Sequence, residues 1–254
     1  MSWQTLPKPA VMAILNATPD SFSDGGLVDR DIDAAVRRAK GEGAHILDVG
    51  GESTRPGHSF VAADDEWARV EPVLAACRRI APGLVISIDT RKASVAKRAL
   101  DAGAHMVNDV SGLLDAGMAK VVAGRAAVVL MRWRDLVGEP VQACRDELAS
   151  ILQAAVRQGI PESDVFLDPG LGFGNPPGGN VEANLALLAG VSQYSHGRPV
   201  LIGASRKRFI GAWMQESNPS QRVTGSVRAA QMAVEAGAAI VRVHDVAATV
   251  AALR

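Results

Sequence analysis

The sequence predicts a TIM (β/α)8 barrel that forms a single domain over residues 1–254. Short apolar segments alternate with longer segments of helical period, which is the pattern of parallel strands joined by crossover helices. The pattern gives eight strands in 254 residues, a length typical of such barrels. No stretch rich in Pro, Gly or Ser divides the chain.

The eight predicted strands are short and apolar. They cover residues 11–17, 45–51, 85–90, 105–110, 126–131, 165–168, 199–204 and 240–246. Between them, apolar residues at i, i+3 and i+4 predict helices. The clearest helical segments are residues 32–41, 65–80, 93–102, 142–158 and 222–235, followed by a short one at 247–254. Gly-Ala pairs at 43–44, 103–104 and 237–238 stand where a helix ends and a strand begins, a position that suits glycine.

A doubly wound open sheet is the main alternative to the barrel. That fold usually has five or six strands, and its dinucleotide-binding form carries GxGxxG after the first strand, which is absent here. The segment GNPPGGN at 174–180 reads as a loop after the sixth strand. The strand count therefore favours the barrel.

The composition favours a soluble protein with a sizeable core, because 48% of residues are apolar and 21% are charged. With 27 basic and 27 acidic residues, a general affinity for nucleic acid or for an anionic membrane has no support. No run of 18 apolar residues occurs, and the first ten residues lack a signal-peptide core, so we expect a cytoplasmic protein. Cys77 and Cys144 fall in predicted helices and are expected to be buried, inert thiols.

Polar residues collect after the C-terminal ends of the predicted strands, where TIM barrels form their active sites. The opposite strand ends carry small residues and prolines, so the asymmetry predicts an active site. The polar residues are Asn16, Asp48, Glu52, Ser53, Thr54, Arg55, Asp89, Asn108, Asp109, Asp168, Ser205, Arg206, Lys207, Arg242, His244 and Asp245.

The carboxylates at this end allow two interpretations. Asp48, Asp109 and Asp245 fit helix caps or structural ion pairs as well as they fit a site. For Asp89 and Asp168 a structural role is less favoured, because two buried carboxylates without partners are costly. A planar heterocycle with several N–H donors would provide those partners.

The cations at this end predict a phosphate site. Arg55, Lys207, Arg242 and His244 come from the second loop and the last two strands, and TIM barrels often bind phosphate at the loops after strands 7 and 8. Period-2 alternation directs Arg242 and His244 toward the barrel axis, and we expect ligand phosphates, not protein carboxylates, to be their counter-charge. Alternatively, residues 206–208 form a solvated charge run.

A metal and two structural histidines complete these expectations. Asn16 could ligate Mg²⁺ through its amide oxygen, together with diphosphate oxygens. His45 and His105 begin strands at the opposite end, so we expect structural roles for both.

Seven segments in order along the chain resemble dihydropteroate synthases. One segment alone would be a weak match, but seven at barrel-unit spacing are specific. They are ILNATPDSFSDGG (14–26), LDVGGESTRPG (47–57), SIDTRK (87–92), VNDVSG (107–112), FLDPGLGFG (166–174), IGASRKRFIG (202–211) and VRVHDV (241–246).

The resemblance implies that 6-hydroxymethyl-7,8-dihydropterin diphosphate and 4-aminobenzoate condense to dihydropteroate and pyrophosphate. The pterin pocket would comprise Asp89, Asn108, Met131, Asp168 and Lys207. The diphosphate would be held by Asn16, Arg55, Arg242 and His244, with Mg²⁺ on Asn16. The aminobenzoate would be framed by Phe22, Thr54, Pro56, Phe173 and Ser205. The catalytic residues would be Arg55, Asp89, Lys207, Arg242 and His244.

In the implied mechanism, diphosphate leaves first, the dihydropterin stabilises the resulting cation, and the neutral arylamine then attacks. The chain departs from the family pattern at Arg132, where a histidine is usual, so a cation is either added at the mouth or points away from it. Late helices commonly form the family's dimer, which implies a homodimer, although the last helix here is a turn or two shorter.

Three other functions stay open at this point. A pterin-binding methyltransferase would share the pterin pocket but would need no diphosphate clamp. A pterin-binding paralogue without catalysis would explain Arg132 and the short loop at 132–142. An aldolase that uses Lys207 as a Schiff base would be trapped by borohydride.

Overall fold

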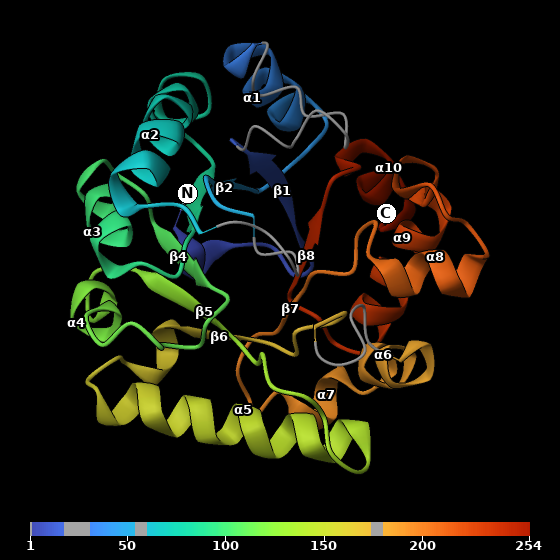
Figure 1. The fold of residues 1–254 in the computed structure, drawn as a ribbon. Coiled ribbons are helices and arrows are strands. Elements are labelled where there is room, and N and C mark those ends of the chain that lie inside the picture. The colour runs from blue at the N-terminus through green and yellow to red at the C-terminus, as the bar shows by residue number, and fades with distance from the viewer. Residues whose placement is uncertain (1, 18–30, 54–59, 174–179) are drawn as a thin grey trace.

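Eight parallel strands form one sheet with helices around it (Figure 1). The computed structural model describes residues 2–17, 31–53, 60–173 and 180–254. The strand order is β6-β5-β4-β3-β2-β1-β8-β7, and a parallel bridge between Leu167 and Val200 joins the two ends. The sheet therefore closes into the predicted barrel, and the open doubly wound alternative is wrong.

The eight strands lie where the sequence predicts them, but most are shorter. Their bounds are β1 Ala10–Asn16, β2 Ile46–Gly50, β3 Val85–Asp89, β4 Met106–Asp109, β5 Ala127–Met131, β6 Val165–Asp168, β7 Leu201–Ile202 and β8 Ile240–Val243. The strand predicted over 240–246 ends at Val243, because Val246 already begins a helix. His244 and Asp245 therefore lie in the turn between β8 and that helix.

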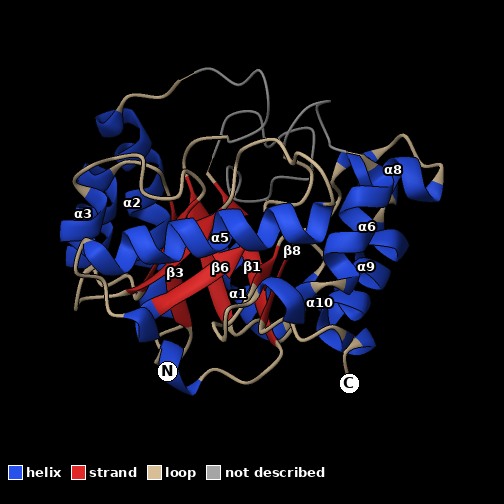
Figure 2. Ribbon diagram, turned by 90° about the horizontal axis from the view of Figure 1, so that it is seen from below, coloured by secondary structure: helices blue, strands red, loops and turns tan. Residues whose placement is uncertain are grey.

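The helices lie outside the strands (Figure 2). Their bounds are α1 Ile32–Gly41, α2 Ala63–Ile80, α3 Ala93–Asp101, α4 Met118–Val122, α5 Pro140–Arg157, α6 Val181–Ala189, α7 Val191–Tyr194, α8 Arg208–Met214, α9 Val223–Glu235 and α10 Val246–Ala252. Short 3-10 turns cover Trp3–Thr5, Glu162–Asp164 and Pro219–Gln221. The clearly periodic segments all form helices, whereas α4, α7 and α8 are too short to show a period.

The core has two parts, one inside the barrel and one between strands and helices. Met12, Ile46, Met106 and Phe166 belong to the inner part, as does Ile240 of β8. Val241 and Val243 belong to the outer part. Because alternate residues of a strand face opposite sides, Arg242 shares the inner face with Ile240, which confirms its predicted direction.

His45 and His105 support the N-terminal end of the barrel, as expected. His45 Nδ1 accepts a hydrogen bond from Val11 N at 3.1 Å, and His105 Nδ1 accepts one from Ile86 N at 3.0 Å. Burial lowers the pKa of both imidazoles, so both rings are neutral and act as acceptors near pH 7.

The two cysteines are free and buried, as expected. Burial raises the pKa of Cys77 and of Cys144 to about 12, so both thiols stay protonated. In the described ranges, no helix is both long and apolar enough to cross a membrane.

Candidate active site

The C-terminal ends of neighbouring strands bring four predicted site residues together at the inner face of the barrel. In the sheet register Gly50 of β2 pairs with Asp89 of β3, and Asp89 pairs with Asn108 of β4. Across the barrel, Met131 of β5 pairs with Asp168 of β6. Asp89 and Asp168 are each 7% exposed and Asn108 is 3% exposed, so this end of the barrel holds buried polar groups.

Arg242 forms ion pairs with two of these carboxylates. Its Nε donates to Asp48 Oδ2 and its Nη2 to Asp89 Oδ2, both at 2.6 Å. The expectation that Arg242 needs no protein counter-charge is therefore wrong. The physical reason is that Asp48 and Asp89 are themselves buried and need a cation. Burial would lower the pKa of Arg242, but the two carboxylates outweigh burial and raise it, so the guanidinium stays charged.

Asp89 Oδ1 and Asn108 Oδ1 are buried acceptors that lack a partner among the described residues, and so is Asp48 Oδ1, which belongs to a fully buried side chain. Asn108 donates through Nδ2 to Asp48 Oδ2 at 3.2 Å. Burial raises the pKa of Asp89 to about 7, with Arg242 opposing the rise and Asp48 adding to it. An unpaired buried acceptor is costly, so the acceptors of Asp89 and Asn108 are suited to a ligand that donates N–H groups.

Asp168 and Lys207 form the opposite side of the cluster. Burial raises the pKa of Asp168 while Lys207 opposes the rise, and Asp168 Oδ1 accepts from Gly170 N at 2.7 Å. Burial lowers the pKa of Lys207 to about 8, with Asp168 opposing the fall. Lys207 Nζ donates to Leu171 O at 2.5 Å and lies 4.7 Å from the centre of the Phe173 ring. Phe173, predicted for the aminobenzoate, therefore adjoins a pterin-site residue.

Ser205 and His244 lie together where β7 and β8 end. Ser205 Oγ is 3.0 Å from His244 Nδ1 and also accepts from His244 N at 3.2 Å. The neighbouring Arg206 pairs with Asp245 at 2.6 Å. The run at 206–208 is thus divided, with Arg206 in a structural ion pair and Lys207 in the site.

Asp109 and Arg132 have structural partners. Asp109 accepts from the backbone N–H groups of Ser111 and Leu113, each at 2.9 Å, and so holds the turn after β4. Arg132 is 1% exposed, and its Nη1 lies 3.8 Å from Glu147 Oε2 of α5, so the side chain points away from the barrel axis. It donates to Pro169 O at 2.8 Å and to the carbonyl of Arg134. Of the two directions left open for Arg132, the buried one is correct.

Asn16 ends β1 beside the same cluster. Asn16 pairs with Gly50 in the sheet register, and a Cβ at Gly50 would lie 3.6 Å from Asn16 Oδ1 and 3.7 Å from Asp89 Oδ2. The amide oxygen of Asn16 therefore faces the region of Asp89. Four other predicted site residues lie outside the described residues, namely Phe22, Thr54, Arg55 and Pro56.

The chain matches known proteins over almost its full length. A family model described as "Pterin binding enzyme" matches residues 12–244. The chain is 41% identical to the dihydropteroate synthase of Neisseria meningitidis serogroup B, over 98% of this chain and 92% of that protein. It is 41% identical to the dihydropteroate synthase of Bacillus subtilis, over 94% of this chain and 84% of that protein. The chain belongs to the dihydropteroate synthase family of pterin-binding enzymes.

Solved structures of this family share the fold. The dihydropteroate synthase of Xanthomonas albilineans with 4-aminobenzoic acid has a TM-score of 0.87 and 43% identity, covering 97% of this chain and 91% of that chain. The Burkholderia cenocepacia dihydropteroate synthase complexed with 7,8-dihydropteroate has a TM-score of 0.84 and 42% identity, covering 97% and 89%.

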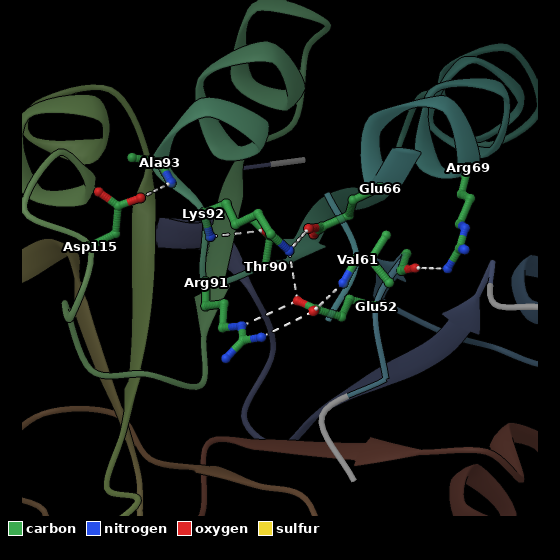
Figure 3. Close-up of polar contacts among 10 residues, drawn as sticks. Glu52, Val61, Glu66, Arg69, Thr90, Arg91, Lys92, Ala93 and Asp115 are labelled. Carbon is green, nitrogen blue, oxygen red and sulfur yellow. Dashed lines mark hydrogen bonds and ion pairs between the residues drawn. The ribbon is translucent and has the colours of Figure 1, made fainter. Parts of the chain in front are cut away.

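A second polar cluster, centred on Glu52, joins the ends of β2 and β3 in this family member (Figure 3). Glu52 accepts from Arg91 Nη2 at 3.0 Å, from Lys92 Nζ at 2.7 Å and from Val61 N at 3.1 Å, and Lys92 also pairs with the buried Glu66. Burial would raise the pKa of Glu52, but the two cations outweigh it and lower the pKa to about 2. The cluster therefore holds residue 61 against residue 52, at the two ends of the segment that carries Arg55.

The sequence left open whether Asp48 forms a structural ion pair or belongs to the site, and the structure shows an ion pair with Arg242. For Glu52 the sequence indicated a place at the active end but no partner. The segment SIDTRK could have indicated the Glu52 cluster, because its Arg91 and Lys92 directly follow a strand at the same end of the barrel, where cations need acidic partners. The partners of Asp48 could not be read from the sequence. They come from β4 and β8, and only the closed barrel brings them together.

Proposed function

We propose that this chain joins 6-hydroxymethyl-7,8-dihydropterin diphosphate to 4-aminobenzoate, giving 7,8-dihydropteroate and pyrophosphate. The observation that carries the proposal is the pair of buried, unpartnered acceptors Asp89 Oδ1 and Asn108 Oδ1 among the described residues. They lie at the active end of a barrel whose relatives, at 41% identity, are dihydropteroate synthases.

The pterin would be recognised by acceptors on both sides of the pocket. Asp89, Asn108 and Asp168 accept hydrogen bonds from its 2-amino and ring N–H groups, which relieves the cost of the unpartnered acceptors. The Lys207 ammonium donates to a pterin acceptor, and the thioether of Met131, which is 2% exposed, packs against the ring.

The diphosphate would be bound by Arg242 and His244 together with Arg55 and Asn16. The ion pairs of Arg242 use one N–H each of Nε and Nη2, and a guanidinium has five N–H donors. Arg242 therefore keeps donors for phosphate oxygens while Asp48 holds it. When the pterin engages Asp89, the charge of Arg242 becomes available to the leaving diphosphate.

The residues fit Mg²⁺ through Asn16. Amide oxygens are ligands that Mg²⁺ accepts, and it usually takes few protein ligands and shares phosphate oxygens. When bound, the ion neutralises charge on the leaving diphosphate.

The aminobenzoate would lie beside Phe173 and Ser205, with Phe22, Thr54 and Pro56 completing its site. Its neutral amine attacks the methylene carbon from which diphosphate departs, so no protein nucleophile is required. Lys207 then serves to bind the pterin and forms no Schiff base, and borohydride with a carbonyl substrate should leave the protein unlabelled.

The protein would act in the cytoplasm as a homodimer through its late helices. Light scattering at micromolar concentration tests the dimer, and a particle with the mass of one chain would contradict it.

The experiment that tests the function is pyrophosphate release from the pterin diphosphate with 4-aminobenzoate and Mg²⁺. We expect release to require both substrates and to fall at least 100-fold in Asp168→Asn, which keeps the side-chain shape. Tight pterin binding without release would favour the paralogue that has lost catalysis. Transfer of a methyl group from methyltetrahydrofolate would favour the methyltransferase.

A further inference from the structure

We infer that Asp48 is a positioning residue that sets the orientation of the Asn108 amide and of the Arg242 guanidinium, and thereby the donor pattern that the pterin pocket accepts. The inference rests on the proposed function, because it concerns how the same pocket recognises its pterin. Nothing in the resemblance assigns a role to Asp48.

Asp48 lies below the pocket and not in it. On β2 it precedes Gly50 by two residues, and Gly50 is the residue in register with Asp89. Two residues of a strand span roughly 7 Å, so the Asp48 backbone lies about that far back along β2 from the residue that pairs with Asp89. Its relative exposure is 0%, and it acts on a ligand only through its neighbours.

One oxygen of Asp48 holds two site residues from opposite sides. Its Oδ2 accepts from Arg242 Nε at 2.6 Å and from Asn108 Nδ2 at 3.2 Å. An amide presents an acceptor on one side and a donor on the other, and its bond to Asp48 fixes which side is which. Because Nδ2 faces Asp48, Oδ1 of Asn108 is left without a partner among the described residues and is available to a ligand N–H.

The same carboxylate keeps Arg242 paired when a substrate arrives. In the structure Arg242 divides its donors between Asp48 and Asp89. A pterin that engages Asp89 competes with the second of these ion pairs, whereas Asp48 is fully buried behind its neighbours. Asp48 therefore anchors Nε while the rest of the guanidinium can turn toward the diphosphate.

Asp48 is not optimised for stability. Its Oδ1 has no hydrogen-bond partner among the described residues, and Ser87, which is in register with it on β3, also has a buried, unpartnered hydroxyl. Buried polar networks that are only partly satisfied stabilise a fold less than an apolar core would. A role in orienting the site explains this arrangement better than a role in folding.

The test is Asp48→Asn, with Asp109→Asn as the matched control. Asp109 is also 0% exposed, but the hydrogen bonds that it accepts come from Ser111 and Leu113 in the turn after β4 and not from the side chains of Asn108 or Arg242. We expect D48N to raise the KM for the pterin diphosphate at least tenfold and that for 4-aminobenzoate less than twofold. D109N should lower the thermal midpoint and leave both KM values within twofold. An equal effect of both variants, or a loss of kcat alone in D48N, would overturn the inference.

Two further measurements separate positioning from structure. The charge of Asp48 adds to the rise in the pKa of Asp89 that burial causes. When pterin affinity is measured against pH, the change that follows the titration of Asp89 should therefore occur at lower pH in D48N than in the wild type. The factor by which D48N raises the KM for the pterin diphosphate should also be at least threefold smaller when Asn108 is already replaced with Ala. An unmoved profile and full additivity would both contradict an action through these two neighbours.

Failure of the proposed function gives a different result. If the wild-type protein binds the pterin diphosphate but releases no pyrophosphate, the proposed condensation is wrong. The test of Asp48 is then the dissociation constant of D48N for the pterin diphosphate divided by that of the wild type, in place of the corresponding ratio of KM values. If the wild type neither binds nor reacts, both proposals are wrong. Should D48N not fold, Asp48→Glu keeps the charge but displaces the oxygen, and it should produce the same selective rise in pterin KM.

Discussion

Replacing Arg242 with methionine removes the cation that faces Asp48 and Asp89 while keeping an apolar stem of similar length. Removing one partner of a buried ion pair typically costs about 3–5 kcal/mol, because the other charge stays buried. The Arg242 side chain is 20% exposed, so water reaches part of the site and we expect the lower end, about 3 kcal/mol at pH 8. A variant designed to probe diphosphate binding will therefore also be less stable.

The loss of stability in R242M should depend on pH. Asp89 has a pKa of about 7 with Arg242 present, and removal of the cation raises that pKa further. Above pH 7 the folded variant therefore binds more protons than the folded wild type, so the difference in stability grows as pH rises. Below pH 6 Asp89 is largely protonated in both proteins, and the difference becomes smaller.

The assay is urea denaturation of wild type and R242M at pH 6 and at pH 8, with His244→Gln as a control that leaves the ion pairs of Arg242 in place. The reasoning predicts a difference of about 3 kcal/mol at pH 8 and a clearly smaller one at pH 6. A difference below about 1 kcal/mol at pH 8, or the same difference at both pH values, would refute it.

Three further predictions follow from the rest of the structure. Because the pKa values of His45 and His105 are lowered in the folded protein, the unfolded chain binds more protons below pH 6.5, and the unfolding free energy should decrease as the pH is lowered. Substituting both histidines with Asn, which keeps an acceptor, should make this decrease smaller in urea titrations at several pH values. Arg132→Met should leave the carbonyl of Pro169 unpaired, lower the unfolding free energy by about 1–3 kcal/mol and weaken pterin binding measured by calorimetry, since Pro169 follows Asp168. Because Lys207 has a pKa of about 8, pterin affinity should decline above pH 8, and Lys207→Arg should move this decline to higher pH.

The barrel could be predicted from the sequence because its cause is local. Eight apolar segments with helical segments between them leave few alternatives, and period-2 alternation alone placed Arg242 on the inner face, as the division of β8 between the two parts of the core confirms. The polar residues after the strands likewise identified the active end, since parallel strands all end on the same side.

The pairing of those polar residues could not be predicted, because it depends on the closed barrel. Arg242 and Asp48 are 194 residues apart, and they meet only because β1 lies between β8 and β2 and an arginine is long enough to cross it. The same limit applies to Arg132, whose direction depends on carbonyls in the turn after β6. Sequence patterns indicate which way a side chain points, but partners across a barrel follow from register and side-chain length.

The most direct measurement of the central claim is mass-spectrometric detection of 7,8-dihydropteroate when the purified protein meets the pterin diphosphate, 4-aminobenzoate and Mg²⁺. The account predicts product in equal amount to pyrophosphate, none without 4-aminobenzoate, and at least 100-fold less with Asp168→Asn. Soluble, folded protein that binds the pterin diphosphate tightly but forms no dihydropteroate would contradict it.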